Sequence, residues 1–141
     1  MPSLSIIIPC YNEYDRLYTN LPIILEYCAD NLIDYEIIFV NDGSTDNTLR
    51  LINSIPNKHI NIISYTQNRG KGYAVRQGLK AAKKDLILFM DADLATDLSC
   101  INTALTYINR IELVYKDFIL VGNRELPNSK VVTLPIRKFI G

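Results

Sequence analysis

The sequence predicts an α/β protein with a doubly wound, mostly parallel sheet and helices on both of its faces. Short β-branched runs alternate along the chain with segments of helical periodicity. The runs are apolar on both faces, as in strands buried between two helical layers. With 141 residues the chain has the usual size of one domain, so we expect residues 1–141 to form a single unit.

Five runs rich in isoleucine, leucine, valine and aromatic residues are the predicted strands. They span residues 4–8, 35–40, 60–65, 86–90 and 117–122. Each run is followed at once by a polar or glycine-bearing cluster. Because ligands of open parallel sheets bind beyond the carboxyl ends of the strands, we expect the five loops to line one cleft.

Apolar residues spaced three or four apart predict four helices between these strands. Their apolar positions are, in order, Leu17, Leu21, Ile24, Leu25 and Cys28; Leu49, Ile52 and Ile55; Val75, Leu79 and Ala82; and Leu98, Ile101, Leu105 and Ile108. Ser44 or Thr45 is the expected cap of the second helix, and the third helix is expected to open near Gly72.

Composition narrows the possible partners and the compartment. Fifteen basic and fifteen acidic residues give a formal net charge of zero, so no overall field recruits nucleic acid. No segment reaches the roughly 18 apolar residues of a membrane span, and the run at 4–8 is no signal peptide, so membrane contact would be peripheral. Cys10, Cys28 and Cys100 are odd in number and lie in apolar patterns, which indicates buried thiols and a cytoplasmic location.

Two carboxylates, Asp91 and Asp93, follow the run at 86–90 in the stretch "LILFMDADLATD". If the strand stays extended through Met90, side chains two residues apart point the same way. Adjacent like charges repel unless a cation neutralises them, which favours a divalent metal, Mg²⁺ or Mn²⁺. The alternative is a helix N-cap, the role that we expect for Asp97.

The clusters after the second and third runs contain residues suited to a nucleotide. Asp42, in "FVNDGSTDNT", is placed to accept hydrogen bonds from a base or a ribose, although the same residues form an ordinary turn. Arg69, Lys71 and Arg76 surround a predicted helix start where phosphate can bind, or they form a solvated helix start. The stretch is neither a Walker A loop nor a GxGxxG motif.

The remaining candidate residues follow the first and fifth runs. Tyr11 is placed to lie against a base or to cover the rim of the sheet, and Glu13 comes two residues later. Arg124 is a planar donor suited to a pair of diphosphate oxygens, or it forms a surface ion pair. His59 follows a turn that contains proline, and we expect it to be solvated.

Five stretches together resemble the family 2 glycosyltransferases of the GT-A fold, closest to the dolichyl-phosphate glucosyltransferase and mannosyltransferase-like branch. These stretches are "SIIIPCYNE", "FVNDGSTDNT", "NRGKGYAVRQG", "LFMDADLAT" and "VGNR". They occur in the family's order, and the resemblance runs through essentially the whole chain.

The resemblance implies a role for each matching position. The residues on the nucleotide side are Pro9, Tyr11, Glu13 and Asp42. Asp42 would hold the base, and Lys71 and Arg124 would contact the diphosphate. Asp91 and Asp93 would form the DxD motif, in which the second acid binds the metal most directly.

The resemblance therefore predicts metal-assisted, inverting transfer of a sugar from a nucleotide-diphosphate sugar, such as UDP-glucose, to a polyprenyl phosphate or a saccharide. Family members continue past "LPIRKFIG" with an acceptor-side segment, so we expect a donor-binding domain truncated at its C-terminus. One alternative is a non-catalytic module that binds nucleotide sugars. Another is a phosphatase of the haloacid dehalogenase type, although its Asp-x-Asp normally follows the first strand.

Overall fold

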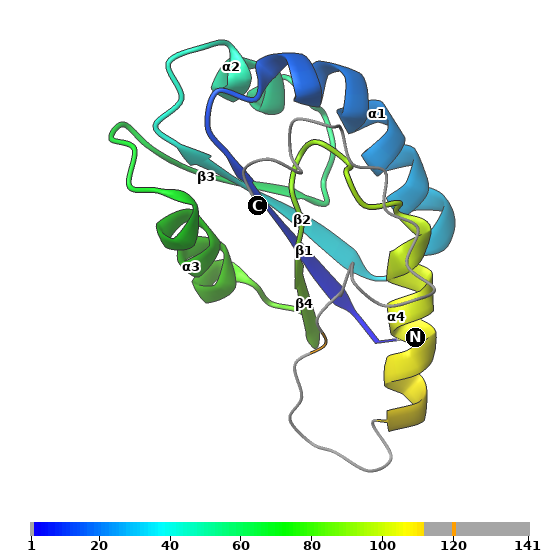
Figure 1. Cartoon of the computed structure of the whole chain (residues 1–141). Coiled ribbons are helices and arrows are strands. Elements are labelled where there is room, and N and C mark those ends of the chain that lie inside the picture. The colour runs from blue at the N-terminus through cyan, green and yellow to red at the C-terminus, as the bar shows by residue number, and fades with distance from the viewer. Residues whose placement is uncertain (1, 112–119, 121–141) are drawn as a thin grey trace, which may run out of the picture. The chain divides into compact units, whose positions relative to one another are not determined.

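Four strands and four helices alternate along the described part of the chain (Figure 1). The computed structural model describes residues 2–111 and residue 120. The chain divides into two units, residues 1–107 and 108–141. The strands are β1 (Leu4–Cys10), β2 (Tyr35–Asp42), β3 (Ile60–Tyr65) and β4 (Leu86–Phe89). The helices are α1 (Tyr14–Asn31), α2 (Thr48–Asn53), α3 (Lys71–Ala81) and α4 (Ser99–Ile111).

The strands form one sheet in the order β3-β2-β1-β4, and every neighbouring pair is parallel. Ile7 in β1 lies opposite Ile38 in β2 and Phe89 in β4, so β1 is a central strand. This arrangement confirms the predicted fold class, and the four strands begin and end within two residues of their predicted limits. The predicted strand at 117–122 lies outside the described residues, apart from Leu120.

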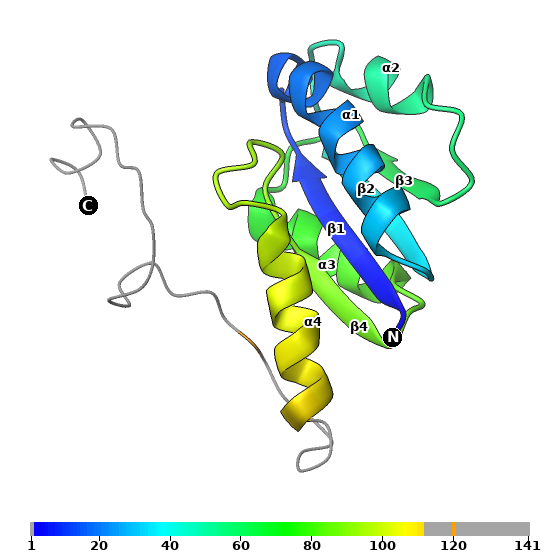
Figure 2. The same cartoon turned by 90° about the vertical axis from the view of Figure 1, so that its right-hand side faces the viewer.

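Helices cover both faces of the sheet because alternate residues of the central strands are apolar in both directions. On one face, α1, α2 and α4 pack on the strands; on the other face α3 is the one helix among the described residues (Figure 2). The core residues of the three-helix face include Ile6, Ile8, Phe39, Leu17, Leu21, Ile24, Ile52, Ile101 and Leu105. The core residues of the α3 face are Ile7, Ile38, Val40 and Ala74. Each large side chain buried in this way stabilises the fold by about 1.5–3 kcal/mol.

The helix α3 approaches β1 through small residues. Ala74 and Gly78 are its buried positions, and a Cβ atom on Gly78 would lie 2.4 Å from Cγ2 of Ile7. The predicted apolar face of α3 is therefore wrong at Leu79, which is 47% exposed, whereas Ala82 packs against the core of this face as predicted. A helix face is recognised in a sequence by its large apolar residues. The buried face of α3 consists of small residues that let its backbone approach β1, so this signal is absent.

Three smaller predictions are also wrong. The helix α2 begins at Thr48 after Asn47, so neither Ser44 nor Thr45 is its cap, and it ends before Ile55. Cys100 is exposed, whereas Cys10 and Cys28 are buried as predicted. Burial raises the pKa of Cys28 to about 11, so its thiol stays protonated at neutral pH.

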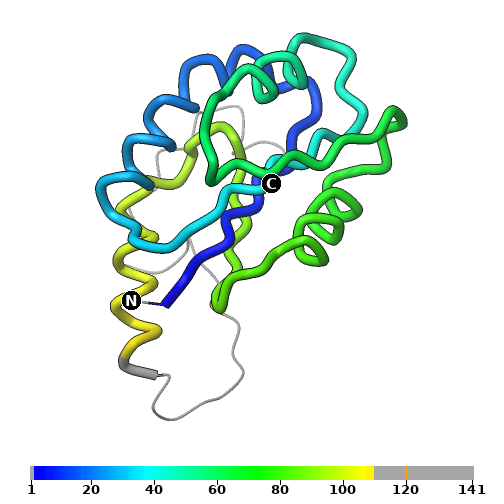
Figure 3. The backbone as a smooth tube through the Cα atoms, turned by 180° about the vertical axis from the view of Figure 1, so that it is seen from behind, coloured from blue at the N-terminus to red at the C-terminus, as the bar shows by residue number. Residues whose placement is uncertain are grey.

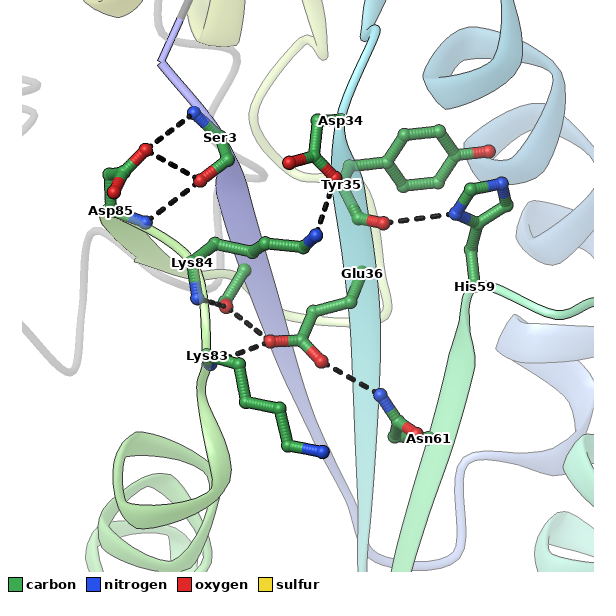
Figure 4. A network of polar contacts seen from close by, with 10 residues as sticks. Ser3, Asp34, Tyr35, Glu36, His59, Asn61, Lys83, Lys84 and Asp85 are labelled. Carbon is green, nitrogen blue, oxygen red and sulfur yellow. Dashed lines mark hydrogen bonds and ion pairs between the residues drawn. The ribbon is translucent and has the colours of Figure 1, made fainter.

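A buried carboxylate joins the strands near their amino ends (Figure 4). Glu36 of β2 accepts hydrogen bonds from Ser5 Oγ at 2.7 Å, Asn61 Nδ2 at 2.8 Å and the backbone N–H of Lys83 at 2.7 Å. It thereby ties β1, β3 and the turn before β4 to β2. A buried charge is tolerated here because hydrogen bonds satisfy it on several sides.

His59, in the same region, is not solvated as predicted. Its ring stacks on Tyr35 with the ring centroids 4.4 Å apart, and its Nδ1 lies 3.0 Å from the carbonyl oxygen of Tyr35.

Among the described residues, no helix combines the length and the apolar character that crossing a membrane requires.

We predict that Gly78→Ala lowers the free energy of unfolding by about 1–3 kcal/mol, because the added methyl group enters the space of buried Ile7. Gly72→Ala is the matched control, since a Cβ there meets nothing within 4 Å and should raise stability by about 0.5–1 kcal/mol. Urea denaturation followed by circular dichroism measures both changes. A stabilising Gly78→Ala would contradict the close packing of α3 on β1.

Candidate functional site

The candidate site lies beyond the carboxyl ends of the parallel strands. β1 pairs with β2 on one side and with β4 on the other, so the loops after these three strands begin at the same edge of the sheet. In Figure 3 the start of α1 and the loop after β4 lie at the same end of the molecule's first unit. The residues predicted for the donor site that the structure describes lie at the ends of these strands, follow them or begin α3.

Lys71 and Asp91 come together from different elements. Lys71 is the first residue of α3, Asp91 follows β4, and the distance from Lys71 Nζ to Asp91 Oδ1 is 2.5 Å. Both side chains are more than half exposed, at 58% and 52%. An exposed ion pair contributes only about 0–1 kcal/mol, so a charged ligand can displace it at little cost.

Asp91 and Asp93 lie on either side of the buried Ala92, just after the strand has ended. β4 stops at Phe89, one residue before the predicted end, but the N–H of Met90 still donates to the carbonyl of Ile7 at 3.0 Å. Ala92 is buried, whereas Asp91 and Asp93 are both exposed. Both carboxylates therefore face solvent, and the residue between them anchors the loop.

Hydrogen bonds fix the turn that contains Asp93. Asn20 of α1 donates from Nδ2 to the carbonyl oxygen of Ala92 at 2.8 Å. Asp93 Oδ1 accepts the N–H of Ala95 at 3.0 Å, and Leu94 between them has a φ of 51°. Such a backbone conformation is uncommon for leucine, which indicates that the surrounding contacts determine the turn.

Asp42 is buried, and it holds the loop that leads to α3. Its Oδ1 accepts the N–H of Arg69 and its Oδ2 accepts the N–H of Gly70, both at 2.8 Å. Its own carbonyl oxygen accepts Nδ2 of Asn68 at 3.2 Å. Asp42 thus fixes the position from which Lys71 starts. Its predicted contact with a base stays a prediction.

Gly43 makes the approach of this loop possible. It has a φ of 71°, and a Cβ there would lie 2.6 Å from the backbone nitrogen of Asn68. Only glycine fits a position that has both a left-handed backbone and a backbone neighbour at this distance.

The three cations of the α3 start do not act together. Arg69 donates from Nη1 to Tyr73 Oη at 3.0 Å, and the Cζ atoms of Arg69 and Arg76 lie 4.9 and 5.7 Å from the Tyr73 ring centroid. The Tyr65 ring meets Tyr73 edge-on, and burial, together with nearby Asp42, raises the pKa of Tyr65. Of the three cations, Lys71 is the one that the structure places beside Asp91.

The residues predicted after the first strand lie at the same edge. Pro9 is partly buried in β1, and Tyr11 is 47% exposed. The carboxylate of Glu13 is paired with Arg16, with 2.8 Å between Oε2 and Nη1. The hydrogen bond and charge of Glu13, with a smaller effect from Asp93, raise the pKa of Arg16. Arg124 lies outside the described residues, so its phosphate contact stays a prediction.

Asn12, which no sequence pattern marks, joins the loops after β1 and β2. Its Oδ1 accepts the N–H of Thr45 at 2.8 Å, the N–H of Asp46 at 3.3 Å and Oγ1 of Thr45 at 3.3 Å. Its φ of 53° is left-handed. Asparagine tolerates this conformation better than most residues, but sequence alone gives no sign that this residue adopts it.

With these positions established, comparison with known proteins identifies the family. The model of the family "Glycosyl transferase family 2" matches residues 5–137. This chain belongs to glycosyl transferase family 2. The family resemblance drawn from the five sequence stretches is thereby confirmed.

Relatives of this family 2 chain include proteins named dolichyl-phosphate beta-glucosyltransferase. One from Trichomonas vaginalis is 37% identical over 147 residues, which cover 98% of this chain and 45% of the relative. One from Saccharomyces cerevisiae is 37% identical over 144 residues, which cover 92% of this chain and 43% of the relative. The chain therefore spans less than half the length of these relatives.

Solved structures agree with the fold of this family 2 chain. The crystal structure of Staphylococcus aureus TarS residues 1–349 is 25% identical, with a TM-score of 0.65, and the match covers 78% of this chain and 33% of TarS. The mannosyltransferase PcManGT of Pyrobaculum calidifontis, solved with GDP-Man and Mn²⁺, is 27% identical, with a TM-score of 0.62. That match covers 76% of this chain and 32% of PcManGT.

We predict that the charge of Asp46 stabilises this edge in a pH-dependent way. Burial opposes ionisation, but hydrogen bonds from Thr48 and Tyr14 outweigh it and hold the pKa of Asp46 below its usual 3.8. Asp46→Asn removes the charge and one of the two acceptor oxygens that the N–H groups of Thr48 and Tyr14 use, and should cost about 1–3 kcal/mol near pH 7. Because the folded-state pKa is lowered, the difference is present above pH 3.8 and disappears as the pH falls through the lower folded value.

Chemical denaturation between pH 3 and pH 7 measures this difference. Asp30→Asn, in the last turn of α1, is the control, because an acid at a helix C-terminus gains nothing from the helix dipole. A difference between wild type and Asp46→Asn that stays constant down to pH 3 would contradict the assigned role.

Proposed function

We propose that this chain binds a nucleotide-diphosphate sugar, such as UDP-glucose, for metal-assisted, inverting transfer of the sugar to a polyprenyl phosphate. The observation that carries the proposal is the pairing of Lys71 with Asp91 at the carboxyl edge of the sheet, with Asp93 two residues further on. Support for the acceptor class comes from the dolichyl-phosphate beta-glucosyltransferase relatives. A lipid acceptor would bring the chain into peripheral contact with the cytoplasmic face of a membrane.

The two aspartates suit a hard divalent cation. In the described part of the chain, the second carboxylate oxygen of Asp91 and of Asp93 accepts no hydrogen bond, which leaves each able to bind a metal. Mg²⁺ and Mn²⁺ prefer oxygen ligands. Within residues 2–111 and 120 no three metal-ligating side chains gather, so the donor diphosphate and water would complete the coordination. The metal would supply positive charge next to the leaving diphosphate.

The base, the nucleoside and the diphosphate of the donor each have a proposed neighbour in the chain. Asp42 would face the base and Tyr11 would flank the nucleoside, together with Pro9 and Glu13. Lys71, released from Asp91 when the metal binds, would turn toward the diphosphate, and Arg124 would contact its oxygens. Because negative charge grows on the bridging oxygen as the sugar leaves, a cation there stabilises the transition state more than the ground state.

A phosphate acceptor removes the need for a general base. In the proposed step an acceptor phosphate oxygen forms a bond to the anomeric carbon while the bond from that carbon to the nucleoside diphosphate breaks. The attacking oxygen is already anionic near neutral pH, so no proton has to be removed. The engagement of Glu13 with Arg16 is compatible with this chemistry, because the reaction makes no demand on that carboxylate.

A second candidate function is a module that binds nucleotide sugars without catalysis. The same donor-side residues, among them the paired Lys71 and Asp91, would serve such a module. An assay for glucose transfer from UDP-glucose to dolichyl phosphate separates the two, because only the enzyme forms the lipid-linked sugar. The phosphatase alternative is set aside by membership of family 2.

We predict that Asp93→Asn weakens Mn²⁺-dependent binding of UDP-glucose by about 10–100-fold, since a neutral amide is a poor ligand for a divalent ion. Titration calorimetry with and without Mn²⁺ measures the effect, and parallel titration with a GDP sugar tests the base. Asp97→Asn is the matched control, because Asp97 Oδ1 accepts the N–H of Ser99 at 2.7 Å and starts α4. Unchanged metal-dependent binding by Asp93→Asn would overturn the metal assignment.

A further inference from the structure

The loop after β2 caps the helix that follows β1. Backbone N–H groups of three consecutive residues, Asn12, Glu13 and Tyr14, donate to side chains of that loop and of the start of α2. The acceptors are Ser44 Oγ at 3.0 Å, Thr48 Oγ1 at 2.9 Å and Asp46 Oδ2 at 3.2 Å. The N-cap residue Glu13 makes no side-chain cap of its own. The first N–H group of α1 and the two N–H groups before it are therefore satisfied by the loop after β2 and the start of α2.

The contacts in the opposite direction all converge on one atom. Asn12 Oδ1 accepts both backbone N–H groups of Thr45 and Asp46 and the hydroxyl of Thr45. Since these bonds run between the loops and not within either of them, a shift of one loop must break bonds or carry the other loop with it. Among the described residues of the loop after β1, Asn12 is the one whose side chain forms hydrogen bonds to the loop after β2.

The joined loops are those that begin at the proposed nucleotide-binding residues. Tyr11 and Glu13 flank Asn12 on one loop, and Asp42 and Gly43 begin the other. We propose that Asn12 is a positioning residue that keeps these two walls in one arrangement before the donor arrives. The inference rests on the proposed function, because it assigns Asn12 to the nucleotide side of that same site. A pre-arranged pocket binds more tightly because less ordering remains to be done on binding.

The geometry distinguishes what each substitution removes. Asn12→Asp keeps an acceptor oxygen in a residue that tolerates a φ of 53°. Asn12→Gly keeps the backbone conformation but removes the acceptor. Asn12→Ala removes the acceptor and also disfavours the backbone, so it does not separate the two effects.

Two measurements on the full chain test the proposal. Amide hydrogen exchange should be faster at Thr45 and Asp46 in Asn12→Gly, and Asn12→Asp should restore the protection. Calorimetry with UDP and Mn²⁺ should show that Asn12→Gly binds UDP about tenfold more weakly. The reason is that a smaller fraction of the molecules has its two loops in the arrangement that binds the nucleotide. Unchanged hydrogen exchange in Asn12→Gly would overturn the positioning role. So would an affinity of Asn12→Gly for UDP equal to that of a wild type that binds UDP.

Asn61→Ala is the control for loss of stability alone. Asn61 donates to Glu36 Oε2 at 2.8 Å near the amino end of the sheet, away from both loops. This variant should unfold at a lower temperature but bind UDP with wild-type affinity. Equal weakening by Asn61→Ala and Asn12→Gly would reduce the role of Asn12 to general stability. A wild type that binds neither UDP nor GDP would instead refute the proposed function, and the positioning role with it.

Discussion

The parallel pairing of β1 between β2 and β4 is the constraint on which the rest of the structure depends. Parallel strands end at one edge, so the loops after all three strands must begin there. The pairing is fixed by burial on both faces: Ile6 and Ile8 face the three-helix layer, whereas Ile7 faces α3. A register shift of one residue would exchange these sets, and close contact between Ile7 and Gly78 makes the α3 side especially intolerant.

Asp42 links this core to the site. It is the last residue of β2, it is 2% exposed, and two backbone N–H groups of the loop after β3 donate to its carboxylate. Those N–H groups belong to Arg69 and Gly70, directly before Lys71. The position of a surface cation therefore depends on a buried acid at the end of a core strand, and Gly43 allows the two backbones to approach.

The sequence was sufficient for the four described strands, the fold class and the family, because apolar runs and ordered motifs are local signals. Both end residues of β3, Ile60 and Tyr65, were predicted correctly. The signal failed where long-range contacts decide the outcome. The buried face of α3 consists of Ala74 and Gly78, which carry little hydrophobic weight, and Ser44 bonds across to Asn12 instead of capping α2. No local pattern marks Asn12, because its importance comes from a loop more than thirty residues away.

The two sides of the site are held with different firmness, and the bonds explain why. On the side of Asn12 and Asp42, reciprocal hydrogen bonds join separate loops, and each involves backbone groups that have few other partners. On the other side, Lys71 and Asp91 form a solvent-exposed ion pair that contributes about 0–1 kcal/mol. For the proposed reaction this division has a physical sense. The firm side would keep its loops in place when a nucleoside binds, whereas the weak ion pair would open so that a metal takes the carboxylate and a diphosphate takes the lysine.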